Sequence, residues 1–390
     1  MQDYGYYSKK NSAKSDRPST LRILKIIDLV LLVITVVCSL LLVCALIARY
    51  VDPRKAYFFA FTGLIFPMLY VAELILCLWW VVRWKKYAIF AAIILLLGMR
   101  TAGGFYRPDF RRHYDDAATP VKSQFTVMSY NVMGFSNKFS TENMGTRQLI
   151  ANLINDNNVD IVCFQEFTTA KTDPSINELL SDFRYYKTFP YAEEDEAKKS
   201  YSGLAIYSRY PILNSSLLAS DGCERSFAAW ADIKIKLDTV RVFAVHLNST
   251  HIDSEDISYL IGLRHGDVDN DNRSHIFSMT GKLRNTYMKR APQALAVAEN
   301  IAQSPHPVIV CGDFNDTPAS FAYHNVRKGL SDAFIKKGSG MDATYNGFLN
   351  MFRIDYIMFS KKLNVTQFLS FDEQFSDHTP IAASFDFSAH

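Results

Sequence analysis

The chain has 390 residues, of which 49% are apolar, and its net charge is +3. Up to Arg112 there are 16 Lys and Arg against 6 Asp and Glu, and subtraction from the totals of 42 and 39 leaves 26 and 33 beyond it. The first part is thus +10 and the second −7, which disfavours a second part that grips nucleic acid through its phosphates. The six cysteines form no CxxC pair and no Cys/His metal spacing, so a disulfide scaffold is not supported.

Three apolar runs occupy the first part. Leu29 to Ala48 is unbroken for about 20 residues, the length that crosses the hydrocarbon layer of a bilayer. Ala56 to Val82 is longer, and Tyr87 to Met99, at about 13 residues, is short for a span. The third run is long enough only if Arg100 extends toward the headgroups. We therefore predict an all-α membrane anchor over residues 23–105 with three transmembrane helices, or two if the third run lies at the interface.

Basic residues set the expected orientation of this anchor. Residues 1–22 are rich in Lys and Arg, and fewer basic residues follow the first run, so residues 1–22 are expected in the cytoplasm. Three spans would place the second part on the outer face, whereas two would keep it in the cytoplasm. We expect a multi-pass protein of a bacterial-type inner membrane with its second part on the periplasmic side. Glu73 is either a functional intramembrane carboxylate or a bundle-facing residue bonded to a neighbour.

Residues 106–120 are charged, carry a proline near each end and predict a linker to a domain of residues 121–390. In that domain short β-type runs alternate with helical spacing, which indicates a large α/β domain with buried strands. A polar stretch from Asp253 to Asn285 is expected to run over the surface as a loop. The predicted strands are Phe125–Tyr130, Asp160–Phe164, Leu204–Ser208, Ala229–Leu237, Val240–Val245, Val308–Cys311, Ile354–Phe359 and Ile381–Phe387.

Polar residues gather at the ends of these predicted strands, where open α/β sheets place their ligands. Any one fragment has a structural explanation, such as a turn at Gly312-Asp313. Together they have the composition of a phosphoryl-transfer site, because carboxylates bind hard cations, amides hold phosphate oxygens or water, and histidines transfer protons. The residues are Asn131, Gln165, Glu166, His246, Asn248, Asp313, Asn315, Arg353, Asp355, Ser376, Asp377 and His378.

The ordered series YN, QE, SGLAIYSRYPI, HLN, GDFN, RIDYI and SDH, from Tyr130 to His378, resembles the endonuclease/exonuclease/phosphatase superfamily. These are metal-dependent phosphohydrolases, and the HLN element is most similar to the sphingomyelinase, deoxyribonuclease and deadenylase branches. The resemblance implies a four-layer α/β sandwich of two packed mixed β-sheets flanked by helices. It covers nearly all of the second part and none of the anchor. Met133 stands where abasic-site endonucleases carry a further acid, which disfavours that branch.

The resemblance also implies a metal site and a water-positioning pair. Glu166 is expected to be the principal ligand of Mg²⁺, for which Mn²⁺ should substitute because both accept hard oxygen donors. Asn131 and Asp377 are expected to complete or orient the shell of that metal. Asp313 and Asn315 are expected to align the attacking water with the scissile phosphate.

Two histidines complete the expected catalytic set. By resemblance His378 is the histidine of the site, held in one tautomer by the carboxylate of Asp355. His246 and Asn248 are expected to contact the phosphate or its leaving group. The resemblance leaves Asp313 and His378 as alternative general bases.

The residues therefore favour a membrane-anchored, Mg²⁺-dependent phosphoesterase that hydrolyses a phosphodiester or a phosphomonoester. Its expected substrate is a lipid headgroup or a soluble phosphoester, and its expected partners are that substrate and the bilayer. A nuclease with the same chemistry is the first alternative, although the −7 charge of the second part disfavours nucleic acid. The second alternative is an inactive member that binds a phosphorylated ligand at the membrane. A binding module would not need the full proton-transfer set, so the enzyme is preferred.

Overall fold

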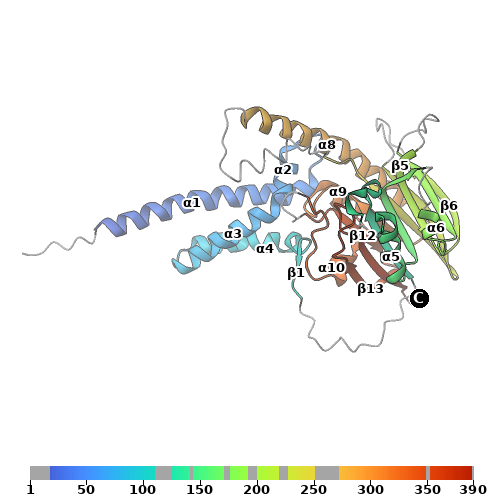
Figure 1. Cartoon of the computed structure of the whole chain (residues 1–390). Coiled ribbons are helices and arrows are strands. Elements are labelled where there is room, and N and C mark those ends of the chain that lie inside the picture. The colour runs from blue at the N-terminus through green and yellow to red at the C-terminus, as the bar shows by residue number, and fades with distance from the viewer. Residues whose placement is uncertain are drawn as a thin grey trace, which may run out of the picture.

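The structure is a computed structural model that describes residues 18–109, 125–140, 144–170, 176–191, 200–218, 227–250, 272–347 and 352–388. It consists of a helical arm and a layered α/β domain from which the arm projects (Figure 1). Most of the expected cytoplasmic segment, most of the expected linker and the first part of the expected polar loop lie outside the described residues.

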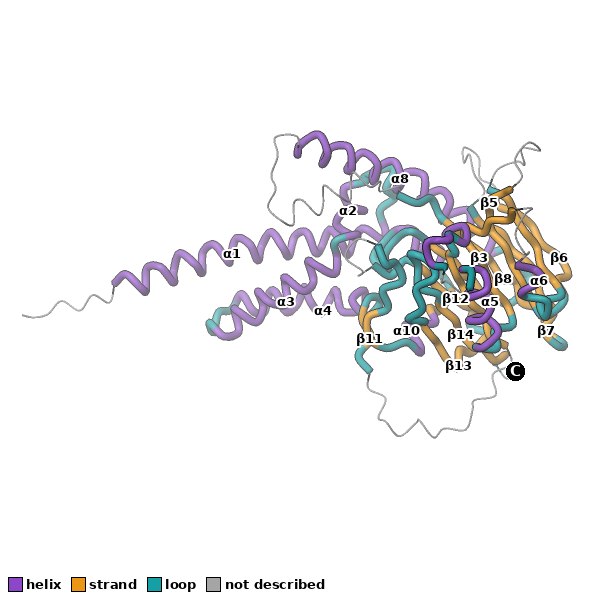
Figure 2. The backbone as a smooth tube through the Cα atoms, viewed as in Figure 1, coloured by secondary structure: helices purple, strands orange, loops and turns teal. Residues whose placement is uncertain are grey.

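Two six-stranded sheets form the centre of the α/β domain (Figure 2). The first sheet has the order β10 (Leu330–Asp332), β12 (Asp355–Ser360), β9 (Val308–Asp313), β8 (Asp238–His246), β7 (Ala228–Ile235) and β6 (Ile212–Leu218). The second has the order β13 (Leu363–Ser370), β14 (Ile381–Phe387), β2 (Phe125–Asn131), β3 (Ile161–Ala170), β5 (Ser200–Ser208) and β4 (Tyr185–Pro190). Both sheets are mixed, because β2 and β3 pair in parallel, as do β8 and β9, and the other pairs within them are antiparallel.

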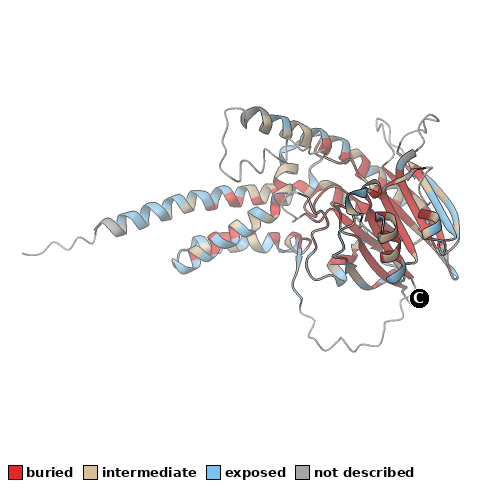
Figure 3. Cartoon of the chain, viewed as in Figure 1, coloured by how far each residue is buried: buried red, intermediate tan, exposed pale blue. Residues whose placement is uncertain are grey.

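Each sheet buries both faces, which is why the strand sequences are almost continuously apolar. One apolar cluster fills the space between the sheets, and a second and a third lie on their outer faces (Figure 3). Helices of the outer layers contribute to these clusters: α5 (Thr146–Asp156) and α6 (Ile176–Leu179) to one, and α8 (Asn272–Ala302) and α9 (Phe321–Val326) to the other. A shorter helix, α10, spans Ala333–Lys337. The predicted four-layer α/β sandwich is confirmed.

All eight predicted strands are present, as β2, β3, β5, β7, β8, β9, β12 and β14. The sequence did not predict β10, β6, β13 and β4, which are the four edge strands of the two sheets. Edge strands alternate between buried and exposed residues or are largely exposed, so they lack the continuous apolar runs of the inner strands. The expected polar loop is also corrected, because its residues from Asn272 onward form the beginning of α8.

The helical arm contains α1 (Pro18–Ile47), the single turn η1 (Ala48–Tyr50), α2 (Phe58–Leu64), α3 (Phe66–Val82) and α4 (Tyr87–Ala102). Among the described residues, one helix, Arg22–Tyr50, is long and apolar enough to cross a membrane. The expected second span is divided into α2 and α3, which meet at an angle of 67°, and α4 is shorter than a full span. Apolar side chains along α1, α3 and α4 are exposed in large numbers, unlike those of the α/β domain (Figure 3).

The arm packs directly against loops of the α/β domain. A Cβ atom on Gly63 of α2 would lie 3.5 Å from the carbonyl oxygen of Ala319, and one on Gly104 would lie 2.8 Å from Pro318. Thr317 donates a hydrogen bond of 3.3 Å to the carbonyl oxygen of Gly63. Two residues of the expected linker, Tyr106–Arg107, form β1 and pair with β11, Gly340–Met341. The end of the arm is therefore tied to the domain instead of leading directly into a linker.

Candidate active site

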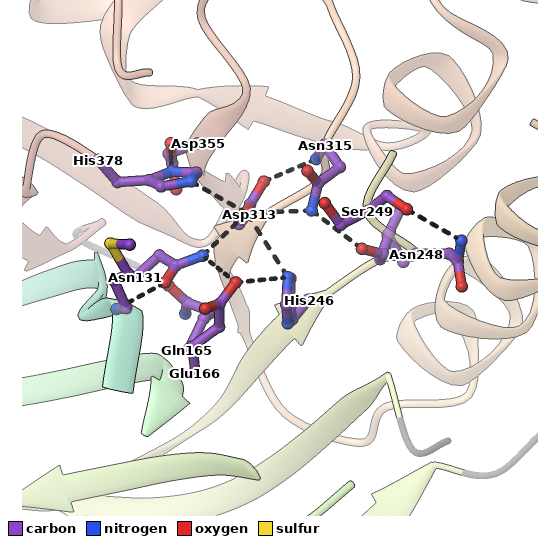
Figure 4. Close-up of polar contacts among 12 residues, drawn as sticks. Asn131, Gln165, Glu166, His246, Asn248, Ser249, Asp313, Asn315, Asp355 and His378 are labelled. Carbon is purple, nitrogen blue, oxygen red and sulfur yellow. Dashed lines mark hydrogen bonds and ion pairs between the residues drawn. The ribbon is translucent and has the colours of Figure 1, made fainter. Parts of the chain in front are cut away.

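The strand topology brings the polar strand ends together. In one sheet β2 and β3 run parallel, and in the other β8 and β9 do. The carboxyl ends of these four strands lie at the same end of the sandwich, where Asn131 bonds to Asp313, and β12, antiparallel to β9, begins there. Register places Asp313 beside both His246 and Asp355, and places Asn131 beside Gln165. Figure 4 shows the resulting cluster around Asp313.

Asp313 lies at the centre of the cluster and is 1% exposed. Its Oδ1 accepts a hydrogen bond from the backbone N–H of Asn315, and its Oδ2 accepts from the side-chain amides of Asn131 at 3.1 Å and Asn315 at 3.0 Å. Burial, with a smaller contribution from the carboxylate of Asp355, raises the pKa of Asp313 to about 7 against the opposing effects of His378 and of the hydrogen bonds from Asn315 and Asn131. At neutral pH this carboxyl group can both accept and hold a proton.

His378 and Asp355 form a buried pair with a distance of 2.9 Å between Nδ1 and Oδ2. The hydrogen bond expected between them is present, and Arg353 instead forms its ion pair with Asp332 at 2.8 Å. Nε2 of His378 lies 3.7 Å from Oδ2 of Asp313. Burial would lower the pKa of His378, but the carboxylates of Asp355 and Asp313 raise it to about 10. At neutral pH His378 is therefore an imidazolium with a proton on each ring nitrogen, of which the one on Nδ1 is donated to Asp355.

Glu166 supplies the partly exposed carboxylate of the site. It sits at an irregularity in the pairing of β3 with β5 and has a φ of 51°, an uncommon value for a residue other than glycine. Its side chain is 38% exposed, and its Oε1 accepts a hydrogen bond of 3.2 Å from Asn131. The irregular backbone turns this carboxylate toward Asp313 at the open side of the cluster (Figure 4).

His246 lies between the two acids, with its Nε2 3.7 Å from a carboxylate oxygen of Glu166 and 3.7 Å from one of Asp313. Its Nδ1 is 2.6 Å from the hydroxyl of Tyr191, which also accepts a hydrogen bond from the backbone N–H of Glu166. A hydroxyl that accepts from Glu166 can donate its proton to Nδ1, which leaves the Nε2–H facing the carboxylates.

Three further residues expected in the site are Asn315, Asn248 and Asp377. The Asn315 side chain donates to the carbonyl oxygen of Leu247 at 3.0 Å as well as to Asp313. The side-chain amide of Asn248 donates to the carbonyl oxygen of Ser249, so it points away from Asp313 (Figure 4). Asp377 accepts from Ser376 at 3.2 Å and, among the described residues, makes no direct hydrogen bond to Glu166.

Asp377 nevertheless lies near Asp313 and Glu166, because all three act on the same tyrosine, Tyr345. Burial raises the pKa of Tyr345, and the carboxylates of Asp377, Asp313 and Glu166 raise it further. The Tyr345 ring lies 5.3 Å from that of His378. These three acids therefore all lie close enough to one tyrosine for their charges to act on it.

Three residues of the cluster have the spacing of a metal site. One ligand atom from each of Asp313, Asp355 and His378 lies within 4.8 Å of the others. However, a protonated imidazole has no free lone pair for a cation. Glu166 and Asp313 bring carboxylate oxygens to the same place through their shared contact with Asn131, and hard oxygen donors suit Mg²⁺ or Mn²⁺.

Sequence reasoning missed Tyr191 and Arg290. Arg290 in α8 is buried, pairs with Asp316 at 3.0 Å and donates to the carbonyl oxygen of Asn248, so it connects the loops after β8 and β9. A tyrosine after an edge strand and an arginine within a polar helix carry no motif of their own. Only the fold shows that both contact the candidate site.

The profile described as the Endonuclease/Exonuclease/phosphatase family matches residues 128–378. The chain belongs to this family, and its activity class is that of a phosphohydrolase. A second profile, described as a domain of unknown function (DUF8431), matches residues 26–105. A search of curated proteins finds no match.

Solved structures also resemble this chain. The catalytic domain of human Nocturnin with bound sulfate is 20% identical over 68% of this chain and 93% of its own, with a TM-score of 0.48. A mannosyl-6-phosphatase from Bacteroides thetaiotaomicron is 18% identical over 67% of this chain and 100% of its own, with a TM-score of 0.45. A 3′ phosphatase from Neisseria bound to a product DNA hairpin has the same identity, coverage and TM-score.

Proposed function

We propose that the chain is a membrane-anchored, divalent-metal-dependent phosphoesterase that acts on a phosphoester carried by a lipid headgroup. The observation that carries this proposal is the contact between the arm and the loop that follows Asp313. Thr317 of that loop bonds to Gly63 of α2, and the ring of Phe61 packs edge-on against Tyr287 of α8 at 5.8 Å. The base of the arm therefore lies beside the loop that follows Asp313, and a bilayer around the arm would present its headgroups near that loop.

The donor set supports a hard divalent cation. Glu166 would hold it with a partly exposed carboxylate, and Asn131 and Asp377 would orient or complete its shell. Asn131 donates to both Glu166 and Asp313, so the two carboxylates converge on one point. When bound, the cation withdraws charge from a phosphate oxygen and stabilises the developing negative charge.

The protein groups divide the remaining chemistry according to their protonation. Asp313, whose pKa is raised to about 7 by burial, can take a proton from the attacking water, with Asn315 fixing the direction of its carboxylate. His378 carries a positive charge at that pH and can donate to a phosphate oxygen. This assignment favours Asp313 over His378 as the general base. His246 would donate its Nε2–H to the phosphate or leaving group, and Asn248 would support the loop beside it.

Two bands of charge border the apolar surface of the arm. At the end far from the α/β domain, Asp28 of α1 pairs with Arg83 after α3 at 2.9 Å. At the near end lie Arg49 and Arg100. The apolar segments between these bands support three crossings, with the far end in the cytoplasm and the catalytic domain outside.

A substrate panel tests the proposed activity. Full-length protein reconstituted in bilayers with Mg²⁺ would be assayed against sphingomyelin, phosphatidylinositol phosphates, bis-p-nitrophenyl phosphate and single-stranded DNA. We expect hydrolysis of a lipid, abolished by EDTA and by Glu166→Gln. Cleavage of DNA without any lipid turnover would contradict the lipid proposal, and undiminished turnover in EDTA would contradict the metal.

A pair of reporter fusions tests the orientation. Alkaline phosphatase fused after His390 is expected to be active, whereas green fluorescent protein at the same position is expected to be dark. A fluorescent fusion beside an inactive phosphatase would place the catalytic domain in the cytoplasm and leave an even number of spans.

A further inference from the structure

A polar cavity lies at the junction of the arm and the α/β domain, and none of its lining residues belongs to the candidate active site. It has a volume of about 230 Å³ and forms where η1 and the end of α4 meet α9 and the chain after it. We call it the junction pocket. Its lining residues are Arg49, Tyr50, Arg100, Thr101, Gly104, Pro318, Tyr323, His324, Arg327, Lys328, Gly329, Leu330 and Ile335.

The lining of the junction pocket is strongly basic and contains no acid. Within the part of the chain that the structure describes, Arg49, Arg100, Arg327 and Lys328 form no ion pair. The buried carboxylate of Asp332 acts on Arg327 through its charge, but it accepts hydrogen bonds from Arg353 and from Tyr323. Its charge is therefore offset mainly by Arg353 inside the domain.

Two guanidinium groups of the pocket have unsatisfied donors. The Nε atoms of Arg49 and Arg327 are buried and have no hydrogen-bond partner. Arg49 donates through another nitrogen to Thr101, and Arg327 lies over the ring of Tyr323 at 5.5 Å. Buried donors are almost always paired, and leaving one unpaired costs about 1–3 kcal/mol. An anion in the pocket would lie beside both guanidinium groups and offset the cost of burying them.

The positive charges of the pocket also act on His324. Burial lowers the pKa of His324, and the positive charges of Arg49, Lys328, Arg327 and Arg100 lower it further. Its ring also packs edge-on against Tyr50 at 4.9 Å, so it lies against the arm.

We propose that the junction pocket binds the phosphate group of an anionic phospholipid. Two arginines from different elements suit the several oxygens of a phosphate, which guanidinium groups bind through paired hydrogen bonds. Water occupies about 30 Å³ per molecule, so the cavity has room for a phosphate and part of an attached glycerol.

The position of the pocket favours a lipid as the source of this phosphate. Arg49 follows directly after the apolar run of α1, and Arg100 lies at the end of α4 nearest the domain. Basic residues at the ends of membrane helices reach the headgroup layer, and basic pockets between such helices bind lipid headgroups. The lipid source rests on the membrane insertion of the proposed function, whereas the affinity for a phosphate anion does not.

The test follows the imidazole signal of His324 by NMR in full-length protein, with His324→Gln to assign it. The protein would carry Glu166→Gln to prevent turnover, and would sit in phosphatidylcholine nanodiscs. Titrations with inorganic phosphate would be compared with nanodiscs that contain phosphatidylglycerol. We expect phosphatidylglycerol to shift the signal and raise the pKa of His324, because the anion offsets the neighbouring positive charges.

The variants Arg49→Gln and Arg327→Gln should each weaken this binding by about 10-fold or more, the size of a lost charge-assisted hydrogen bond. The exposed Lys361→Gln is the matched control and should bind as before. In an otherwise wild-type chain, Arg327→Gln should leave hydrolysis of soluble bis-p-nitrophenyl phosphate unchanged, so the pocket and the catalytic proposal can fail separately. Equal binding by Arg327→Gln, or no shift with either probe, would overturn the pocket. Saturation by inorganic phosphate without a response to phosphatidylglycerol would overturn the lipid source.

Discussion

The two halves of the candidate site differ in burial and in what holds them. Asp313, Asp355 and His378 are at most 4% exposed and are joined by direct hydrogen bonds or close ion pairs. Glu166 is 38% exposed and is positioned by an irregular backbone and by Asn131. The buried half is therefore organised before any ligand arrives, and the exposed half is the part free to meet one. Variants in the two halves should differ accordingly in their effects on folding.

Glu166→Gln should cause the largest loss, reducing metal-dependent hydrolysis to background, because a neutral amide is a poor ligand for a hard dication. The unfolding free energy should change by only about 0.5 kcal/mol, as for an exposed substitution without a core role. Calorimetric titration with Mg²⁺ and thermal unfolding would measure both. Glu178→Gln, an exposed acid in α6, is the control and should bind metal and turn over normally. Metal-dependent turnover in the Glu166 variant would remove this residue from the metal site.

His378→Ala should lower kcat by roughly 10²–10⁴-fold, the range for a lost proton donor. Unlike Glu166→Gln, it should also destabilise the fold, because it leaves Asp355 buried without its partner. Steady-state kinetics and urea unfolding would separate the two effects. An unfolding free energy equal to that of wild type would show that the buried half is not organised by this pair.

Asp355→Asn should lower kcat by about 10- to 100-fold, as expected for loss of a group that fixes a histidine. The double variant with His378→Ala should be little worse than His378→Ala alone, because residues that act as one unit are not additive. If the loss of kcat in the double variant were instead the product of the two single losses, Asp355 and His378 would act independently.

The pair should also make stability depend on pH. The pKa of His378 is raised in the folded state, so its charge stabilises the fold fully below about 6.5, its ordinary value. That contribution is lost as pH rises toward about 10. In EDTA, the stability advantage of wild type over His378→Ala should therefore shrink from pH 6 to pH 10, as chemical denaturation would measure. An advantage that grows over this interval would contradict the charged assignment.

Tyr191→Phe should have the smallest effect, about fivefold on kcat, the size of one neutral hydrogen bond. The Tyr191 hydroxyl bonds to His246, which lies beside Asp313, and accepts a hydrogen bond from the backbone of Glu166, so it contacts neighbours of both halves of the site. The pH profile of kcat should shift as well, because His246 loses the group that selects its tautomer. An unchanged profile with a lowered melting temperature would mean that Tyr191 only supports the structure.

The sequence predicts the inner strands and the residues at their ends because burial on both faces leaves a clear apolar signal. Asp313 follows the run VIVCG and Glu166 follows IVCFQ, so both are located without any structure. The order of strands in the sheets carries no such signal. The approach of Asp355 to His378, 23 positions away, was supplied by family resemblance and not by the pattern.

Other features depend on contacts that no local pattern encodes. Tyr191 follows an edge strand, and its value lies in a hydroxyl that reaches across to β8. The division of the second apolar run into α2 and α3 had one sequence signal, Pro67, which stands in the first turn of α3. Hydropathy alone treats that run as continuous, because the bend preserves its apolar character.

Gly104 brings the arm into close contact with the loop after β9, since a side chain there would press on Pro318, and Gly63 leaves room only for ordinary van der Waals contact with Ala319. A domain held this closely cannot swing on a tether. If the arm spans a bilayer as proposed, the candidate active site would stay at one height above the lipid surface, and the enzyme would meet a lipid substrate by lateral diffusion in two dimensions. It would then distinguish lipids by how far their phosphates stand from the bilayer as well as by their chemistry.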